Sequence, residues 1–187
     1  QALDKVGFPL RKGNIMASNP QWCLTLDEWR AQFSKWIRTP EPVALLNATI
    51  FFDFRLLYGK AELPDAMRRH LLSQAAATPI FLQAMARNAL EVGPPLGKIR
   101  DFVTDLEAGH PGKIDLKKYG SRIFVDVARI YALAVGIHST NTLQRLKLAA
   151  QKMNIKGEEI NAVLEGLNFI QLLRLQHQYL ENEPGVQ

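Results

Sequence analysis

The sequence predicts an all-α fold, a bundle of seven or eight helices. Two observations carry this prediction. Through most of the chain, apolar residues recur three and four positions apart, as they do on one face of a helix. Proline, glycine and capping residues interrupt these segments at short intervals, at positions where helices begin and end. Helices joined by such short turns are typical of a bundle.

Residues 1–24 lack helical periodicity and contain Gly, Asn and Pro, so we expect an extended leader at the junction with an upstream domain. The chain begins with Gln rather than Met, and we expect it to belong to a longer protein. The first helix should begin at Thr25, because Thr25 and Glu28 fit a capping box. Trp29 and Trp36 share one face of this helix, which favours core or interface positions.

Three further helices are expected at about 42–54, 64–77 and 79–90. Proline near the first position of a helix is well tolerated, because its missing N–H would have no partner there. In the region 98–116, turn residues separate two partly alternating segments, which indicates a short β-hairpin.

The last three helices are expected at about 121–135, 141–153 and 157–180, with Thr140 capping the second of them. The final helix is apolar nearly all round, which is typical of a central helix. Together these elements predict one helical domain over residues 25–182.

The composition is that of an ordinary globular domain, with 187 residues, 47% of them hydrophobic and 22% charged. The net charge of +5 is spread along the chain, which favours an anionic ligand more than nucleic acid. Cys23 is the one cysteine, so no internal disulfide forms, as expected of a cytoplasmic protein. No apolar run reaches the ~18 residues that a membrane span needs. The histidines, at positions 70, 110, 138 and 177, show no metal-ligand spacing.

Gly120, Ser121 and Asp126 raise the question of a nucleotidyltransferase catalytic site. A site of the polymerase-β type needs a Gly-Ser turn followed by two acids, two positions apart on a strand, that hold a divalent metal ion. Here the position two after Asp126 is Ala128, and the spacing after Ser121 is helical. We therefore expect no catalytic acid pair in this chain.

The expected helix at 121–135 instead carries a polar stripe of Arg122, Asp126 and Arg129. Its apolar face would hold Ile123, Val127, Ile130 and Ala134. One interpretation of the stripe is intrahelical ion pairing, worth about 0.2–0.5 kcal/mol per pair. The other is a positive shelf, preceded by Lys117 and oriented by Asp126, that faces a phosphate or a neighbouring domain.

Other polar residues lie within apolar segments. Asp53 and Arg55, two apart on an expected helix, do not face each other, so each needs its own partner. They either brace adjacent helices or hold an arginine toward a ligand. In the last helix the polar residues are Asn168, Gln171, Arg174 and Gln178. They form either a hydrogen-bond network that fixes the bundle register or the floor of a cleft, with Arg174 as an anion contact. Ser18 and Asn19 are further candidates for ligand contacts.

Several stretches between Gly13 and Gln178 resemble a known family. They are GNIMASNPQW, LDEWRAQFSKWI, ALLNATIFFDFRLLYG, PPLGKIRDFV, IDLKKYGSRIFVDVARIYAL and FIQLLRLQHQ. Together they resemble the putative nucleotidyltransferase substrate-binding domain of bacterial signal-transduction proteins. IDLKKYGSRIFVD also resembles, more faintly, a segment of the enzymes that uridylylate PII nitrogen regulators.

The resemblance implies a helical domain that follows a nucleotidyltransferase domain, with CBS and cyclic-nucleotide-binding domains farther upstream. This half would hold a nucleotide or an acceptor without catalysing transfer and without a cofactor of its own. Mg²⁺ and a nucleoside triphosphate would serve the parent protein. The residues expected to meet phosphate or acceptor charge are Lys117, Arg122, Arg129, Arg55 and Arg174. The alternative is an interaction module that relays signals or forms a homodimer and has no ligand of its own.

Overall fold

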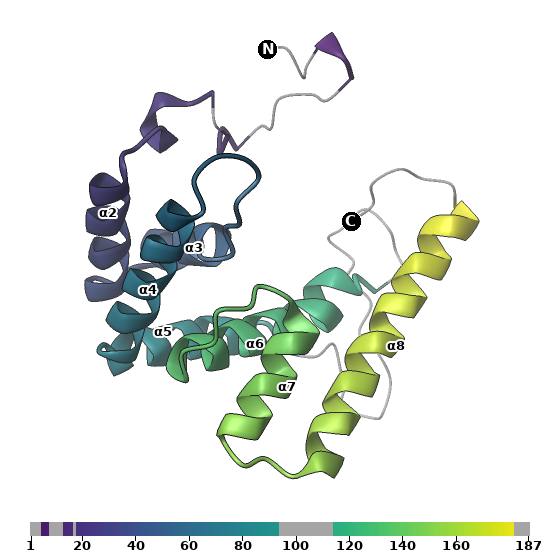
Figure 1. Cartoon of the computed structure of the whole chain (residues 1–187). Coiled ribbons are helices and arrows are strands. Elements are labelled where there is room, and N and C mark those ends of the chain that lie inside the picture. The colour runs from purple at the N-terminus through teal and green to yellow at the C-terminus, as the bar shows by residue number, and fades with distance from the viewer. Residues whose placement is uncertain (1–4, 8–12, 17, 94–113, 182–187) are drawn as a thin grey trace.

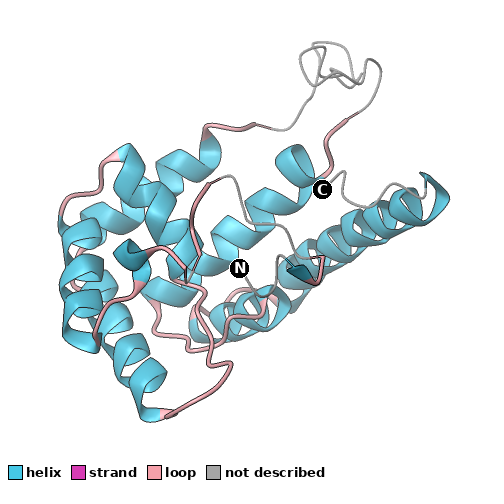
Figure 2. Cartoon of the chain, turned by 90° about the horizontal axis from the view of Figure 1, so that it is seen from above, coloured by secondary structure: helices cyan, strands magenta, loops and turns pink. Residues whose placement is uncertain are grey.

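A computed structural model describes residues 5–7, 13–16, 18–93 and 114–181, and every regular element in these ranges is helical (Figures 1 and 2). The α-helices there are α2 (Leu26–Arg38), α3 (Pro42–Phe51), α4 (Glu62–Ala76), α5 (Pro79–Leu90), α6 (Arg122–Ala134), α7 (Thr142–Lys152) and α8 (Gly157–Glu181). A 3-10 turn, η1 (Pro20–Trp22), precedes α2, and a π-helical turn, η2 (Lys117–Ser121), runs directly into α6. The predicted all-α fold is confirmed. None of the helices described is long and apolar enough to cross a membrane.

The helices α2 to α5 share an aromatic core. Phe33, Phe52 and Phe81 are buried, and the centroid distances are 4.8 Å between Phe33 and Phe52 and 6.0 Å between Phe52 and Phe81. Trp36 is also buried, and the half-buried Trp29 lies edge-on to it with ring centroids 6.4 Å apart. Aromatic rings of this size supply most of the apolar area that such a core removes from water. The predicted core role of the two tryptophans on α2 is confirmed.

The start of α2 is fixed by the predicted capping box. The backbone N–H of Thr25 donates to the Glu28 carboxylate at 2.7 Å, and the N–H of Glu28 donates to the Thr25 hydroxyl at 3.3 Å. Two N–H groups that α2 itself leaves without a partner are satisfied in this way.

The second half of the molecule is organised around α6, which packs against α4, α5, α7 and η2. A second apolar cluster, with Ala128, Leu146, Leu164 and Leu167 buried, joins α6 to α7 and α8. Figure 1 shows α7 and α8 side by side at the opposite end of the molecule from α2.

The prediction that the last helix is central is wrong, because α8 lies at the edge of the fold. In the part of the chain described here it packs mainly against η2 and α7. Its outward side exposes Phe169, Leu172 and Leu175 at 61%, 52% and 63%. A helix with apolar residues on two faces looks central from its sequence, although only one of those faces is buried here.

Three helix boundaries differ from those expected. α3 ends at Phe51, so Asp53 and Arg55 lie on a loop rather than on a helix. α4 begins at Glu62, which places Pro64 inside its first turn, where the missing N–H costs nothing. The cap of α7 is Asn141, whose side chain accepts the N–H of Gln144 at 2.9 Å. The expected hairpin at 98–116 falls mostly on residues 94–113, which lie outside the described ranges.

Candidate functional site

Four charged side chains form a buried ion-pair cluster, which we define as Asp53, Asp126, Arg129 and Arg145. Arg129 donates to Asp53 through Nη2 at 2.6 Å and Nε at 3.2 Å, and to Asp126 through Nη1 at 2.9 Å. Arg145 donates to the other oxygen of Asp53 at 2.5 Å. Since these residues come from the loop after α3, from α6 and from α7, the cluster ties the two halves of the molecule together.

The cluster is screened from water. The side chains of Arg129 and Arg145 are 7% and 4% exposed, and that of Asp53 is 28% exposed. Burial alone would raise the pKa of Asp53, but the hydrogen bond from Arg145 and the positive charges of Arg129 and Arg145 outweigh it. The pKa of Asp53 therefore lies below the ordinary value of an aspartate. Two carboxylates balance two guanidinium groups, as buried charges require.

Two members of the polar stripe of α6 face the interior, whereas the third, Arg122, is exposed. Asp126 and Arg129 are buried beside Ala128, Ala132 and Leu133. On the expected apolar face of the helix, Ile123, Val127 and Ile130 are half-buried, with Val127 and Ile130 packed against the apolar clusters, and Ala134 is exposed. Apolar spacing alone does not predict that Asp126 and Arg129 are buried, because ion pairing allows charged side chains to enter a core. The intrahelical ion pairs that the spacing predicted are present, since Asp126 accepts from both Arg122 and Arg129.

A third buried arginine, Arg68 of α4, binds backbone carbonyls just after the end of α3. Its two terminal nitrogens donate to the backbone carbonyls of Phe52 and Phe54, both at 2.6 Å. Carbonyl groups at a helix end need such partners, and Arg68 supplies them for the loop that carries Asp53. Burial and the nearby charge of Arg145 lower the pKa of Arg68, while Asp53 partly offsets this effect.

Basic residues lie in and around the π-helical turn η2, at the start of α6. The N–H of Arg122 bonds to the carbonyl of Lys117, five residues earlier, so these two residues lie one turn apart on the same side. Arg174 of α8 reaches this turn, where its Nη1 donates to the Ser121 hydroxyl at 3.1 Å. We call Lys117, Arg122 and Arg174 the basic corner.

The basic corner is less neutralised than the ion-pair cluster. Arg122 contributes only Nε to Asp126, at 3.4 Å, and its side chain is 46% exposed. Within the described part of the chain, Arg174 donates to neutral groups, the Ser121 hydroxyl and the Gln171 amide oxygen. Asp115 precedes the turn, and its carboxylate accepts the N–H groups of Lys117 and Lys118 at 2.8 and 2.9 Å. The corner therefore presents a net positive surface that suits an anion.

Gly120 allows η2 to approach α8. A Cβ at this position would lie 3.1 Å from Cγ2 of Ile170, closer than ordinary van der Waals contact. The glycine of the Gly-Ser pair thus has a packing role, and it lets Arg174 reach the turn.

The remaining expected site residues do not join this corner. Arg55 is exposed on the loop after α3. Asn168 is exposed on α8, and Gln178 is half-buried there. Asn19 caps η1 by accepting the N–H of Gln21 at 3.0 Å, and Ser18 beside it is exposed.

Sequence reasoning missed Arg68 and Arg145. Each lies within a buried stripe of its helix, Arg68 with Met67 and Leu71, and Arg145 with Leu146. An arginine at a position that helical spacing assigns to the core must find partners, and this was the signal that could have identified both residues.

The described residues do not suit a divalent metal ion. No group of three or more His, Cys, Asp or Glu side chains within these ranges converges to hold one. The carboxylates of Asp53 and Asp126 are already engaged by arginines, which leaves no oxygen set of the kind that Mg²⁺ prefers.

Two protein families match the chain. Residues 79–186, more than half of its length, match the family described as putative nucleotidyltransferase substrate binding domain. Residues 1–43 match the family described as putative nucleotidyltransferase. The first match contains α5 to α8 and hence the basic corner, and the second contains η1 and α2. No curated protein and no solved structure matches the chain. The resemblance read from the sequence is confirmed, and the chain belongs to the putative nucleotidyltransferase substrate-binding domain family.

Proposed function

We propose that this chain is the substrate-binding, non-catalytic helical part of a nucleotidyltransferase and that its basic corner holds an anionic group of the nucleotide or acceptor. The observation that carries the proposal is the convergence of Lys117, Arg122 and Arg174 at a π-helical turn. Turns of this kind occur often at functional sites.

The geometry of Arg122 supports the proposal. Asp126 engages Nε of Arg122, which leaves its two terminal nitrogens without a partner among the described residues. A guanidinium group held in this way can donate two parallel hydrogen bonds to a phosphate or a carboxylate. Asp126 is itself fixed by Arg129, so the buried ion-pair cluster acts as the support that orients Arg122.

Transfer chemistry would belong to the nucleotidyltransferase domain of the same protein. Mg²⁺ and a nucleoside triphosphate would act there, and we propose a uridylyltransferase-like reaction in a cytoplasmic bacterial signalling protein that also carries CBS and cyclic-nucleotide-binding domains. The match of residues 1–43 to a nucleotidyltransferase family and the resemblance of the sequence motifs support this assignment.

Calorimetric titration of the chain with nucleoside triphosphates tests the proposal. Replacing Arg122 or Arg174 by alanine should weaken binding at least about tenfold, because charge-assisted hydrogen bonds contribute about 1.5–3 kcal/mol. Arg30→Ala is the matched control, since Arg30 pairs with Asp27 on α2, at the other end of the molecule. Equal affinities for all four proteins would contradict the assignment.

A second candidate function is an interaction module that relays signals or dimerises. The exposed apolar side of α8, with Phe169, Leu172 and Leu175, favours it. Light scattering over a range of concentrations separates the two functions. A stable dimer that gives no heat with nucleotide would support the second function and contradict the first.

A further inference from the structure

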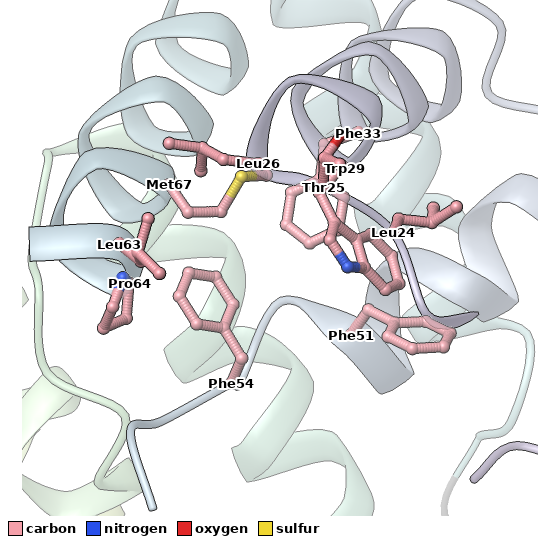
Figure 3. A pocket seen from close by; sticks show the side chains of 10 residues that line it. All are labelled: Leu24, Thr25, Leu26, Trp29, Phe33, Phe51, Phe54, Leu63, Pro64 and Met67. Carbon is pink, nitrogen blue, oxygen red and sulfur yellow. The ribbon is translucent and has the colours of Figure 1, made fainter. Parts of the chain in front are cut away.

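An apolar pocket opens between α2, the end of α3 and the start of α4 (Figure 3). Its volume is about 430 Å³, and its lining residues are Leu24, Thr25, Leu26, Trp29, Phe33, Phe51, Phe54, Leu63, Pro64 and Met67. Thr25 supplies the one hydroxyl of this lining, and that hydroxyl donates to Glu28 at 2.7 Å. The pocket therefore suits apolar side chains rather than a charged ligand.

The walls of the pocket come from two parts of the chain. Leu24 to Phe33 lie within residues 1–43, which match the nucleotidyltransferase family. Phe51 to Met67 lie between the two family matches. Within this chain, the nucleotidyltransferase-matched helix α2 already packs against α3 and α4. The pocket is thus an open continuation of the contact that α2, which lies within the nucleotidyltransferase match, makes with α3 and α4.

The loop between the lining residues Phe54 and Leu63 carries exposed apolar side chains. The loop between α3 and α4 leaves the pocket at Phe54 and returns to it at Leu63. On this loop Leu57 and Tyr58 are 84% and 98% exposed. Exposed apolar side chains of this kind mark protein interaction surfaces or ligand-binding grooves, and the nucleotidyltransferase match of the neighbouring α2 favours a protein here. Figure 1 shows this loop and the segment before α2 at the same end of the molecule, away from α7 and α8.

We propose that the nucleotidyltransferase domain docks on this face, by placing apolar side chains into the pocket and against Leu57 and Tyr58. We define the docking face as the pocket together with these two residues. The indole N–H of Trp29, which makes no hydrogen bond to the described residues, points into the pocket in Figure 3 and would donate to a backbone carbonyl of the docked segment. That the partner is a nucleotidyltransferase domain rests on the proposed function. The basic corner lies on other elements, namely η2, α6 and α8.

Hydrogen exchange measured by mass spectrometry tests the docking face. The same peptides are compared in this chain alone and in the longer protein that joins it to the nucleotidyltransferase domain. We expect the exchange of backbone amides to slow at least about tenfold in residues 51–67 of the longer protein. Exchange in α7 and α8 should stay unchanged. In the longer protein, Leu57→Asp should restore fast exchange, whereas Leu175→Asp, which adds a charge to an exposed leucine of α8, should not.

Unchanged exchange in residues 51–67, or protection confined to α8, would overturn the proposal. Protection of these residues in the chain alone that increases with its concentration would identify a second copy as the occupant and would also overturn it. These outcomes are distinct from failure of the proposed function, because nucleotide affinity at Arg122 and Arg174 is measured separately.

Discussion

Replacing Asp53 by asparagine removes the carboxylate that joins α6 and α7. Asp53 accepts two hydrogen bonds from Arg129 and one from Arg145, and both arginines are almost fully buried. The substitution keeps the size of the side chain but leaves two buried cations with Asp126 as the remaining carboxylate of the cluster. The loss is therefore electrostatic rather than steric.

The expected loss of unfolding free energy follows from the burial of Arg129 and Arg145. Removing one charge from a buried ion pair costs about 3–5 kcal/mol. The Asp53 side chain is 28% exposed, and an asparagine oxygen can still accept one of the bonds, so we expect the lower end, about 3 kcal/mol. For a chain of this size, 1 kcal/mol shifts the melting temperature by about 2–4 °C. Asp53→Asn should therefore melt roughly 6–12 °C below the wild type.

Urea unfolding followed by circular dichroism measures this loss. The midpoint should fall without a change in the dependence on urea, since the folded structure stays compact. Asp27→Asn is the control, because Asp27 pairs with Arg30 at 3.0 Å on the surface and is 89% exposed. The control should lose at most about 0.5 kcal/mol. If Asp53→Asn cost no more than Asp27→Asn, the ion-pair cluster would not contribute to holding α6 against α7.

Three further predictions concern pH, capping and packing. Because the pKa of Asp53 is lowered in the folded protein, its contribution to the unfolding free energy is complete above its unfolded pKa of about 3.9 and is lost as the pH falls through its folded pKa. The unfolding free energy of the wild type should thus fall more steeply below about pH 4 than that of Asp53→Asn. Parallel curves for the two proteins would refute this. Thr25→Ala should cost about 1 kcal/mol in urea unfolding through loss of the cap of α2, and an unchanged midpoint would count against it. Gly120→Val should cost about 1–3 kcal/mol because its side chain would crowd Ile170, and Ile170→Ala in the same protein should recover part of the loss; additive losses would argue against this contact.

The sequence predicted the helical elements because their signals are local. Apolar spacing, the capping box at Thr25 and the prolines at 42 and 79 each act within one or two turns, so the chain reveals them directly. The burial of Arg129 on α6 was not accessible in the same way. It depends on Asp53, which pairs with Arg129 and Arg145 from 76 and 92 positions away.

The basic corner could be predicted in part. Lys117, Arg122 and Arg174 were identified from their charge and from the family motifs, but nothing in the spacing indicated that they would meet. Their meeting depends on a π-helical turn and on the close approach of Gly120 to Ile170. The hydrogen bond of a π-helical turn spans five residues, whereas that of an α-helix spans four. The apolar periodicity of so short a segment does not resolve this difference.

The proposed function is tested most directly by asking whether a nucleotide binds at the basic corner. We would follow the guanidinium Nε–H signals of the chain by ¹⁵N NMR during titration with a nucleoside triphosphate in the absence of metal. We expect saturable shifts of the signals of Arg122 and Arg174, with those of Arg30 and Arg38 of α2 unchanged. Shifts confined to α2, or equal small shifts of all exposed arginines, would contradict the claim that this corner binds the substrate.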